Sequence, residues 1–382
     1  MKLLTDGKAE RSKFTLGRNI DPEIARLDGE GAQQEISGTK PHPGRKEYGV
    51  WDNLPSSSFD VEKTYYNLPM LKEPVWGWAI PAYLYVGGAS GASSLLAAAA
   101  GVVSPRRLKR LIFRGRLVTL SGLVISTLLL VYDLGRKSRF LNMLRVFRPT
   151  SPMSMGSWIL ASSGAFTTAS LIFNGRNRFL RKTSRVFGIG SGVSGIMLSG
   201  YTGVLLAYSA IPAWRETRRT LPILFIASGI SGASSTLELT NLSRREDAVV
   251  HSFSVAGLIA ELVAAKALEM EIKNYKHTEK TLHEGTPGFL WKVGRLMSAA
   301  ALILALIPGR SKKKKTVTAV LESMGAMSMR FAIFKAGQVS ARDPKAVFEL
   351  QRGEKYLHKE SAQKEMEKTA KEEPEATLEE MA

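Results

Sequence analysis

Between about Val75 and Lys335 the chain is a succession of apolar blocks, each long enough to cross a lipid bilayer. About 20 apolar residues, at about 1.5 Å of helix rise each, span the hydrocarbon core. Backbone polar groups inside lipid must be satisfied within the segment, so such blocks fold as helices. The sequence therefore predicts an all-α integral membrane protein with eight transmembrane helices. They are Val75–Val103, Leu111–Leu134, Pro152–Phe173, Val186–Trp214, Leu221–Leu242, Ala248–Leu268, Phe289–Pro308 and Thr316–Lys335.

Charged segments flank the apolar region on both sides. Residues 1–74 mix acidic and basic side chains with Gly and Pro, and they lack the apolar stretch of a cleavable signal peptide. Residues 341–382 are rich in Glu, Lys and Ala, which is typical of a solvated helix or a disordered tail. We expect an extramembrane N-terminal tail over 1–74, an eight-helix domain over 75–340 and a charged C-terminal tail over 341–382.

The first and fifth blocks carry a repeated stretch. PAYLYVGGASGASSLL, residues Pro81–Leu96, and PILFIASGISGASSTL, residues Pro222–Leu237, agree at half of their positions. Four spans separate the copies, and an even number of crossings gives both the same orientation. The sequence predicts two parallel four-helix halves, about 75–214 and 219–340. Small residues let helices approach closely inside lipid, so we interpret the repeat as a packing surface.

Basic residues in the short loops indicate the orientation in the membrane. The loops opposite the termini contain PRRLKR, GRNRFLRKTSR, SRRED and GRSKKKK, and they hold more Lys and Arg than the loops on the side of the termini. Lys and Arg concentrate in cytoplasmic loops. This rule predicts that both termini are non-cytoplasmic.

The cysteine and histidine content excludes several metal centres. The chain has no cysteine, which removes disulfides, cysteinyl iron–sulfur ligation and thiolate zinc sites. Only His251 lies inside an apolar block, and one histidine cannot supply a bis-histidine pair for haem. We therefore expect no haem, no iron–sulfur cluster and no metal in this chain.

Three stretches resemble a known family. IPAYLYVGGASG at Ile80–Gly91, VYDLGRKSRFLNMLRVFRPTSPMSMGSW at Val131–Trp158 and YTGVLLAYSAIPAW at Tyr201–Trp214 are similar to the polysulfide reductase membrane subunit (NrfD-like) family. The resemblance covers about residues 65–260. It implies a haem-free membrane anchor and quinone-reacting subunit that uses menaquinone or ubiquinone. It also implies an iron–sulfur (ferredoxin-like) subunit and a molybdopterin catalytic subunit as partners, in a bacterial cytoplasmic membrane.

Asp133 and Tyr201 are the candidate groups that contact the quinone head. Quinol oxidation releases two protons, so a site needs an acceptor beside each oxygen. Asp133 ends an apolar helix and can pair with Arg136 or Arg139, while Tyr201 lies in the fourth span. Trp76 and Tyr83, where the first span begins, complete the predicted quinone-binding set. The alternatives stay open: Asp133 only caps its loop, and Tyr201 only bonds within the bundle.

Charged residues inside the later spans form a second predicted group. Counted from the helix ends, Glu261, Arg295 and Arg330 lie at similar depth, so we expect Arg295 or Arg330 to neutralise Glu261. Farther toward the opposite face lie Glu238, His251 and Glu322. Together these six residues outline a proton path or, alternatively, a set of structural ion pairs.

The resulting hypothesis is a quinone-reacting membrane subunit that exchanges electrons between a membrane quinone and an iron–sulfur protein. Because it supplies no electron carrier, the chain is not expected to be catalytic alone. Membrane lipid is an expected partner and nucleic acid is not. The alternative is a secondary transporter or proton-conducting bundle, since internal repeats and buried charges fit transporters too. A plain anchor without a quinone site is a third interpretation.

Overall fold

The computed structural model describes residues 71–348 apart from Gly135, Arg176 and Arg310, together with the backbone of two short strands. The strands, β1 (Ile20–Asp21) and β2 (Arg26–Leu27), pair antiparallel, with Ile20 opposite Leu27. They belong to a unit of residues 1–63, and the helices belong to a unit of residues 64–382. Most of the two predicted tails lies outside the described residues.

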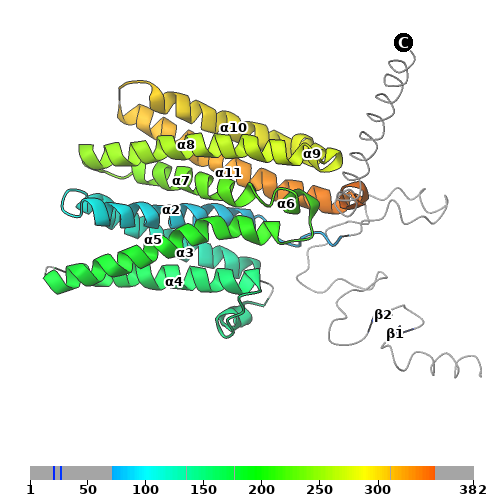
Figure 1. Ribbon diagram of the computed structural model, residues 1–382, viewed down its shortest axis with the longest axis horizontal. Helices are drawn as coiled ribbons and strands as arrows, with labels where there is room; N and C mark the ends of the chain where they lie inside the picture. Colours follow the sequence, from blue (N-terminus) through cyan, green and yellow to red (C-terminus); the bar gives the residue numbers. More distant parts are fainter. Residues whose placement is uncertain are drawn as a thin grey trace, which may run out of the picture. The chain divides into compact units, whose positions relative to one another are not determined.

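The described part of the second unit is helical, and its long helices run side by side (Figure 1). One helix of at least 18 residues lies in each of the eight predicted apolar blocks. The elements are α2 (Ala79–Val103), α3 (Lys109–Asp133), the 3₁₀ helix η3 (Lys137–Leu144), α4 (Pro152–Ile172), α5 (Arg178–Ala207), α6 (Pro212–Arg215), α7 (Leu221–Glu238), α8 (Arg244–Ile272), α9 (Lys276–His283), α10 (Gly285–Leu306) and α11 (Lys312–Arg342).

Six of these helices are long and apolar enough to cross a membrane: α2, α3, α5, α8, α10 and α11. Helices α4 and α7 are 21 and 18 residues long but are rich in Ser and Gly, which lowers their hydropathy. Helix α7 packs against α2, α5, α8 and α11, so most of its residues are buried in protein. The protein is a multi-pass membrane protein, and its helix α7 lies among other long helices.

The fourth long helix ends earlier than predicted from the sequence. Helix α5 stops at Ala207, and Trp214 lies in the separate short helix α6. Pro212 begins α6, and a proline disfavours helical geometry in the residue before it. Ile211 is accordingly extended, with φ −76° and ψ 124°. This turn places Trp214 beside α11 instead of at the end of α5.

Glycines allow three helices to pack backbone against backbone at the centre of the bundle. A Cβ at Gly91 of α2 would overlap the Gly195 carbonyl of α5, and a Cβ at Gly229 of α7 would lie 2.9 Å from the Gly88 carbonyl of α2. Ser199 of α5 donates a hydrogen bond to the same Gly88 carbonyl at 3.0 Å. The repeated stretch therefore does form a packing surface, as small residues in membrane helices do.

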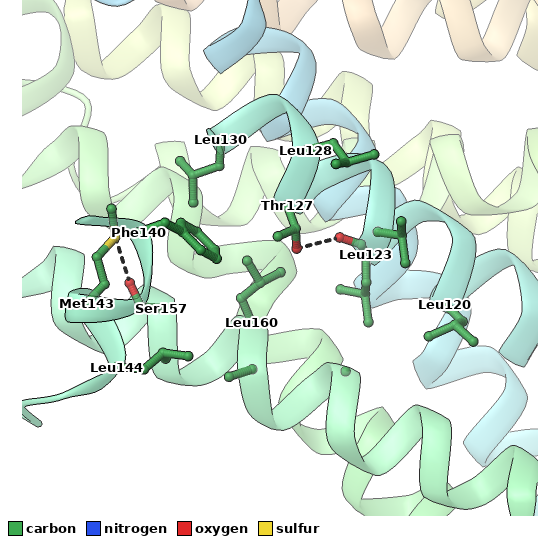
Figure 2. Close-up of a pocket in the computed structure, with 13 residues that line it drawn as sticks. Leu120, Leu123, Thr127, Leu128, Leu130, Phe140, Met143, Leu144, Ser157 and Leu160 are labelled. Carbon is green, nitrogen blue, oxygen red and sulfur yellow. Dashed lines mark hydrogen bonds between the residues drawn. The ribbon is translucent and has the colours of Figure 1, made fainter. Parts of the chain in front are cut away.

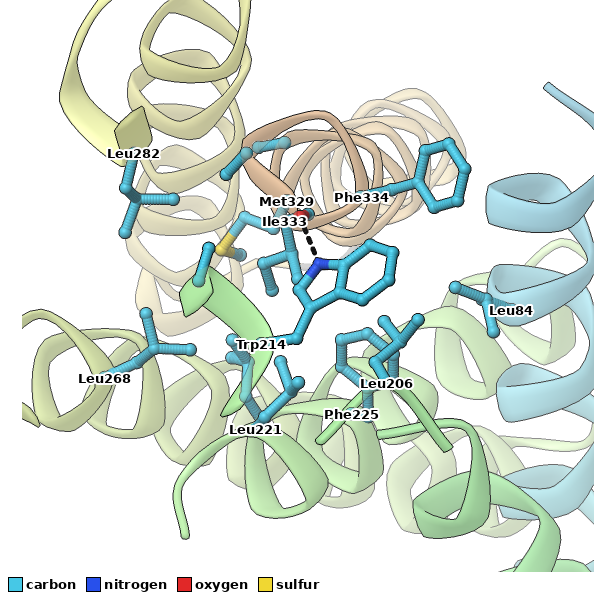
Figure 3. Packing of buried hydrophobic residues seen from close by; sticks show 14 of the residues in the cluster. Leu84, Leu206, Trp214, Leu221, Phe225, Leu268, Leu282, Met329, Ile333 and Phe334 are labelled. Carbon is cyan, nitrogen blue, oxygen red and sulfur yellow. Dashed lines mark hydrogen bonds between the residues drawn. The ribbon is translucent and has the colours of Figure 1, made fainter. Parts of the chain in front are cut away.

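An aromatic cluster joins the segment that precedes α2 to the helices α6 and α11. Trp214 is fully buried, and its indole N–H donates to the Ile333 carbonyl at 2.9 Å, as the dashed line in Figure 3 marks. Phe334 lies 6.0 Å from Trp214 between ring centroids, and Trp76 stacks on Trp214 at 6.1 Å. A Cβ at Gly337 would overlap the Trp214 ring, so this helix position admits only glycine without rearrangement.

Replacing Gly91 with alanine should lower the stability of the bundle. The added methyl overlaps the Gly195 carbonyl and forces α2 and α5 apart, and such overpacking costs about 1–3 kcal/mol. The measurement is the free energy of unfolding in detergent, followed by tryptophan fluorescence. Gly101→Ala, on the same helix, is the matched control because nothing lies within 4 Å of its added Cβ. Equal stability of the two variants would show that the α2–α5 contact is not close.

Candidate functional site

A buried arginine lies where α2, α7 and α11 meet. The side chain of Arg330 on α11 is 1% exposed and donates hydrogen bonds to the Leu84 carbonyl of α2 and the Phe225 carbonyl of α7. Its Nε also donates to Ser228 Oγ at 2.8 Å, and the guanidinium lies 4.6 Å from the Phe225 ring centroid. Leu84 and Phe225 are each the fourth residue of their copy of the repeat. One cation thus binds equivalent carbonyls of both copies.

Glu261 of α8 is fully buried close to this arginine. Neither of its carboxyl oxygens has a hydrogen-bond partner. The Arg330 charge acts on Glu261, although no ion pair within 4 Å joins them, and Ser231 of α7 is the neighbouring hydroxyl. A fully buried, unpartnered carboxyl group is rare in native proteins and calls for a water, an ion or a function.

Glu322 of α11 lies two helical turns before Arg330 and is also fully buried. Its carboxyl group accepts hydrogen bonds from Ser234 Oγ of α7 at 2.8 Å and from Ser254 Oγ of α8 at 3.0 Å. The next residue, Ser323, lies 2.5 Å from the Tyr85 hydroxyl of α2. Four helices therefore contribute polar groups at this level of the bundle.

Glu238 and His251 continue this line of polar groups at the opposite end of α7. Glu238 ends α7 and is buried, and its Oε1 lies 3.7 Å from His251 Nδ1 of α8. Along α7 the polar residues follow helical spacing on one side. We name the whole set the polar line: Arg330, Ser228, Glu261, Ser231, Glu322, Ser234, Ser254, Glu238 and His251.

Of the two cations predicted to neutralise Glu261, Arg330 is the one nearby, and Arg295 pairs with another acid. Arg295 of α10 forms its ion pair with Glu269, which also accepts a hydrogen bond from Trp291 Nε1 at 2.9 Å. Glu269 lies two turns beyond Glu261 on α8. The depths of Glu261 and Arg295 in the membrane were counted from the helix ends, on the assumption that these ends lie at the same height. The chain, however, forms the extra helix α9 between the end of α8 and the start of α10. The Arg295 side chain is consequently 39% exposed, in contrast to buried Arg330.

Asp133 anchors the segment that precedes α2. Its Oδ1 accepts a hydrogen bond from the Gly77 backbone N–H at 3.1 Å, and the carboxyl group is half-buried at the end of α3. The Arg136 side chain is exposed on the same side of the bundle. The capping interpretation of Asp133 thus has a specific contact, the hydrogen bond from Gly77.

Tyr201 of α5 packs against the start of α4. Its hydroxyl donates to the Pro152 carbonyl at 2.6 Å. A Cβ at Gly156 would overlap its ring, so the glycine makes room for the tyrosine. Tyr83 of α2 is buried and lies near Tyr201. The structure therefore brings Tyr83 and Tyr201 together, while Trp76 stacks in the aromatic cluster on Trp214.

A cavity of about 320 Å³ lies between α3 and α4 beneath η3, and Figure 2 shows its lining. We call it the α3–α4 cavity. Its polar side chains are satisfied within the protein: Thr127 Oγ1 donates to the Leu123 carbonyl and Ser157 Oγ donates to the Met153 carbonyl. The lining residues are Leu120, Leu123, Val124, Thr127, Leu128, Leu130, Phe140, Met143, Leu144, Ser157, Leu160, Ala161 and Gly164.

Arg116 of α3 is a buried charge outside the sets of site residues that the sequence predicted. It donates from α3 to Ser184 Oγ of α5 at 2.7 Å and to the Ser170 carbonyl of α4 at 2.8 Å. Ser170 lies in the last turn of α4, where unpaired carbonyls carry partial negative charge. The end of α4 and the α5 hydroxyl thus stabilise a cation inside the bundle.

Sequence reasoning also missed the serines of the polar line and the α3–α4 cavity. A signal for the serines exists, because Ser228, Ser231 and Ser234 recur every third residue before Glu238 and face one side of α7. The cavity has no comparable signal, since its walls are ordinary leucines whose spacing fits any lipid-facing helix.

These features define a polytopic membrane protein with buried charges in both parts of its helical bundle. Within the described residues, no three His, Asp or Glu side chains are grouped as metal ligands would be. The chain belongs to the NrfD family: residues 67–341 match the family described as "Polysulphide reductase, NrfD". This confirms the resemblance inferred from the motifs. The family indicates a membrane subunit of a quinone-linked oxidoreductase complex. Among curated proteins, none matches the chain.

A double-mutant cycle should detect coupling between Glu261 and Arg330. In the Arg330→Met background, Glu261→Gln should cost at least about 1 kcal/mol less stability than in the unmodified protein, because the cation has gone. Unfolding free energies in mixed detergent supply the four values. Arg295→Met is the control, since its partner is Glu269 and no coupling to Glu261 is expected. Coupling near zero for Arg330 would contradict an electrostatic link.

Proposed function

We propose that the chain is the quinone-reacting membrane subunit of a respiratory oxidoreductase and exchanges electrons with an attached iron–sulfur subunit. The observation that carries this proposal is the family match over residues 67–341, which takes in the long helices from α2 to α11. The iron–sulfur subunit would in turn serve a molybdopterin catalytic subunit. Menaquinone or ubiquinone would be the membrane substrate. The chain would bind and orient the quinone, and its partners would carry the electrons.

The quinone head would bind at the end of the bundle that holds Asp133, Tyr83 and Tyr201. Asp133 has one carboxyl oxygen engaged by Gly77, and its other oxygen can take a proton. Tyr201 can exchange its Pro152 contact for a hydrogen bond to a quinone oxygen. Trp76 would form part of the apolar wall through its stacked ring. Pockets of this kind combine apolar walls with few polar groups that set orientation.

The iron–sulfur partner would dock at the same end of the bundle. Arg136, Lys137, Arg145 and Arg148 are exposed on and beside η3, next to Asp133. Exposed basic side chains favour an acidic partner surface and speed its association. A partner at this face would bring its nearest cluster close to the quinone, as electron transfer between separate chains requires.

The packing of the helices supports two four-helix halves. Helix α2 packs against α3, α5 and α7, and α7 packs against α8, α11 and α2, so each copy of the repeat has corresponding neighbours. We propose that α2–α5 and α7–α11 are these halves, in the same orientation. By the loop charges, the termini would be non-cytoplasmic and the protein would reside in a bacterial cytoplasmic membrane.

The polar line would serve as a proton path through the second half. Buried acids in membrane helices are costly and usually functional. Glu238 and His251 stand at one end, Glu322 in the middle and Glu261 beside Arg330. A water between Glu261, Ser231 and Arg330 would connect the line and satisfy the carboxyl oxygens. The same residues favour a second candidate function, a proton-conducting bundle or transporter.

Replacing Asp133 with asparagine should lower quinone-linked turnover of the whole complex at least about tenfold, because general acid–base groups contribute at least that much. The amide oxygen of an asparagine at this position can still accept the Gly77 hydrogen bond, so assembly should be unchanged. Asp247→Asn is the control, since Asp247 pairs with Lys315 at the other end of the bundle. Full activity of the Asp133→Asn variant would favour a plain anchor.

Replacing Glu322 with glutamine should lower the number of protons moved per electron by half or more. Glutamine can still accept hydrogen bonds from Ser234 and Ser254 but cannot exchange a proton. The measurement uses the complex in proteoliposomes with a pH-sensitive dye, and turnover with an uncoupler should persist. Glu284→Gln, on an exposed residue, is the control. Unchanged proton movement would identify the polar line as structural, and proton movement without redox partners would favour the transporter.

A further inference from the structure

We propose that the α3–α4 cavity binds the isoprenoid tail of the quinone, in an inference that rests on the proposed function. Four properties of the cavity carry the inference: its chemistry, its opening, its closed end and its position beside Asp133 and Tyr201.

The lining of the cavity suits a hydrocarbon chain and nothing more polar. Leu123 and Leu160, both nearly buried, form its floor with Leu198 of α5 behind them. The hydroxyls of Thr127 and Ser157 are bonded within their own helices. The hydrogens of both hydroxyls are therefore engaged, and a polar ligand would lose most of its own hydrogen bonds on entering this mainly aliphatic lining.

The cavity opens toward lipid along α3. Val124 and Leu128 lie on its rim and are 52% and 63% exposed. From Leu120 to Leu130 the wall extends ten residues, which is about 15 Å at 1.5 Å per residue. This length along the helix follows the direction that an isoprenoid chain takes in a bilayer, and Figure 2 shows the leucines spread along it.

The 3₁₀ helix closes the end of the cavity that lies nearest the membrane surface. Phe140, Met143 and Leu144 of η3 line this end, and the Met143 sulfur lies 3.6 Å from the Ser157 hydroxyl oxygen. A phospholipid chain would have to pass under η3 to reach its own head group at the surface. A chain whose head group is held inside the protein meets no such obstacle, which favours the quinone tail over a phospholipid.

The closed end adjoins the proposed site of the quinone head. Leu130 lies one turn before Asp133 on α3. Ser157 directly follows Gly156, whose position is covered by the Tyr201 ring. A quinone with its ring between Asp133 and Tyr201 would therefore have its tail beside the closed end of this cavity, from which the wall leads along α3 toward the lipid opening.

Substitutions that fill the cavity test binding of the isoprenoid tail independently of binding of the quinone head. Gly164 has open space around an added Cβ, so Gly164→Leu projects a side chain into the cavity without a backbone clash. Ala161→Leu fills the same wall in case the first variant assembles poorly. Gly101→Leu is the matched control, because an added Cβ there also meets nothing within 4 Å and Gly101 is not a lining residue of the cavity. Each variant is prepared as the full complex.

The assay compares quinols with one head group and two tails, the full isoprenoid chain and a single isoprene unit. We expect Gly164→Leu to raise KM for the long-tailed quinol about tenfold, equal to about 1.4 kcal/mol, and to leave KM for the short-tailed quinol unchanged. The purified variant should also retain less endogenous quinone, measured by solvent extraction and mass spectrometry, with its phospholipid content unchanged.

Three outcomes would overturn the proposal. Unchanged KM values for both quinols would show that the tail lies elsewhere, and equal rises for both would show that the substitution perturbs the head site. Loss of phospholipid in place of quinone would assign the cavity to a lipid chain. If the unmodified complex oxidises neither quinol, the proposed function itself fails, and that result is distinct from the other three.

Discussion

The structure depends on the contact between α2 and α7, the two helices that carry the repeated stretch. Inside a bilayer no hydrophobic contrast draws helices together, so the contact must come from close packing and from polar bonds. Gly88 and Gly229 bring the backbones together, and Ser199 of α5 and Arg330 of α11 reach the carbonyls beside them. The other long helices pack around this centre, which positions the polar line on one side and the α3–α4 cavity on the other.

The buried polar groups of α3 to α5 differ in kind from those of α7, α8 and α11. This difference corresponds to the two proposed roles, quinone binding and proton movement. In α3 to α5 the buried cation Arg116 is satisfied by the end of α4 and by Ser184, which leaves an apolar cavity free beside it. In α7, α8 and α11 the buried acids lie within reach of serine hydroxyls and of one arginine. Acids exchange protons, and an apolar cavity admits a hydrocarbon chain. The proposed quinone and proton roles follow this difference in chemistry.

Hydrophobic blocks made the helices predictable, because burial in lipid imposes the same length and composition on each of them. Their ends were less predictable: Pro212 separates α6 from α5, and α9 displaces the start of α10, which invalidated the depth estimate for Arg295. Asp133 and Tyr201 were found from a family motif, but their partners Gly77 and Pro152 could not be. Such contacts depend on how segments distant in sequence meet, and no periodicity along one helix encodes that.

The Arg330 contacts also limit how the two copies of the repeat can diverge in evolution. The guanidinium would lie 2.6 Å from a Cβ at Gly88, whereas a Cβ at the equivalent Gly229 would meet the hydroxyl of Ser199. One copy is thus restricted by a cation and the other by a small neutral side chain. Both equivalent positions therefore require glycine, although a different neighbour imposes the requirement on each copy.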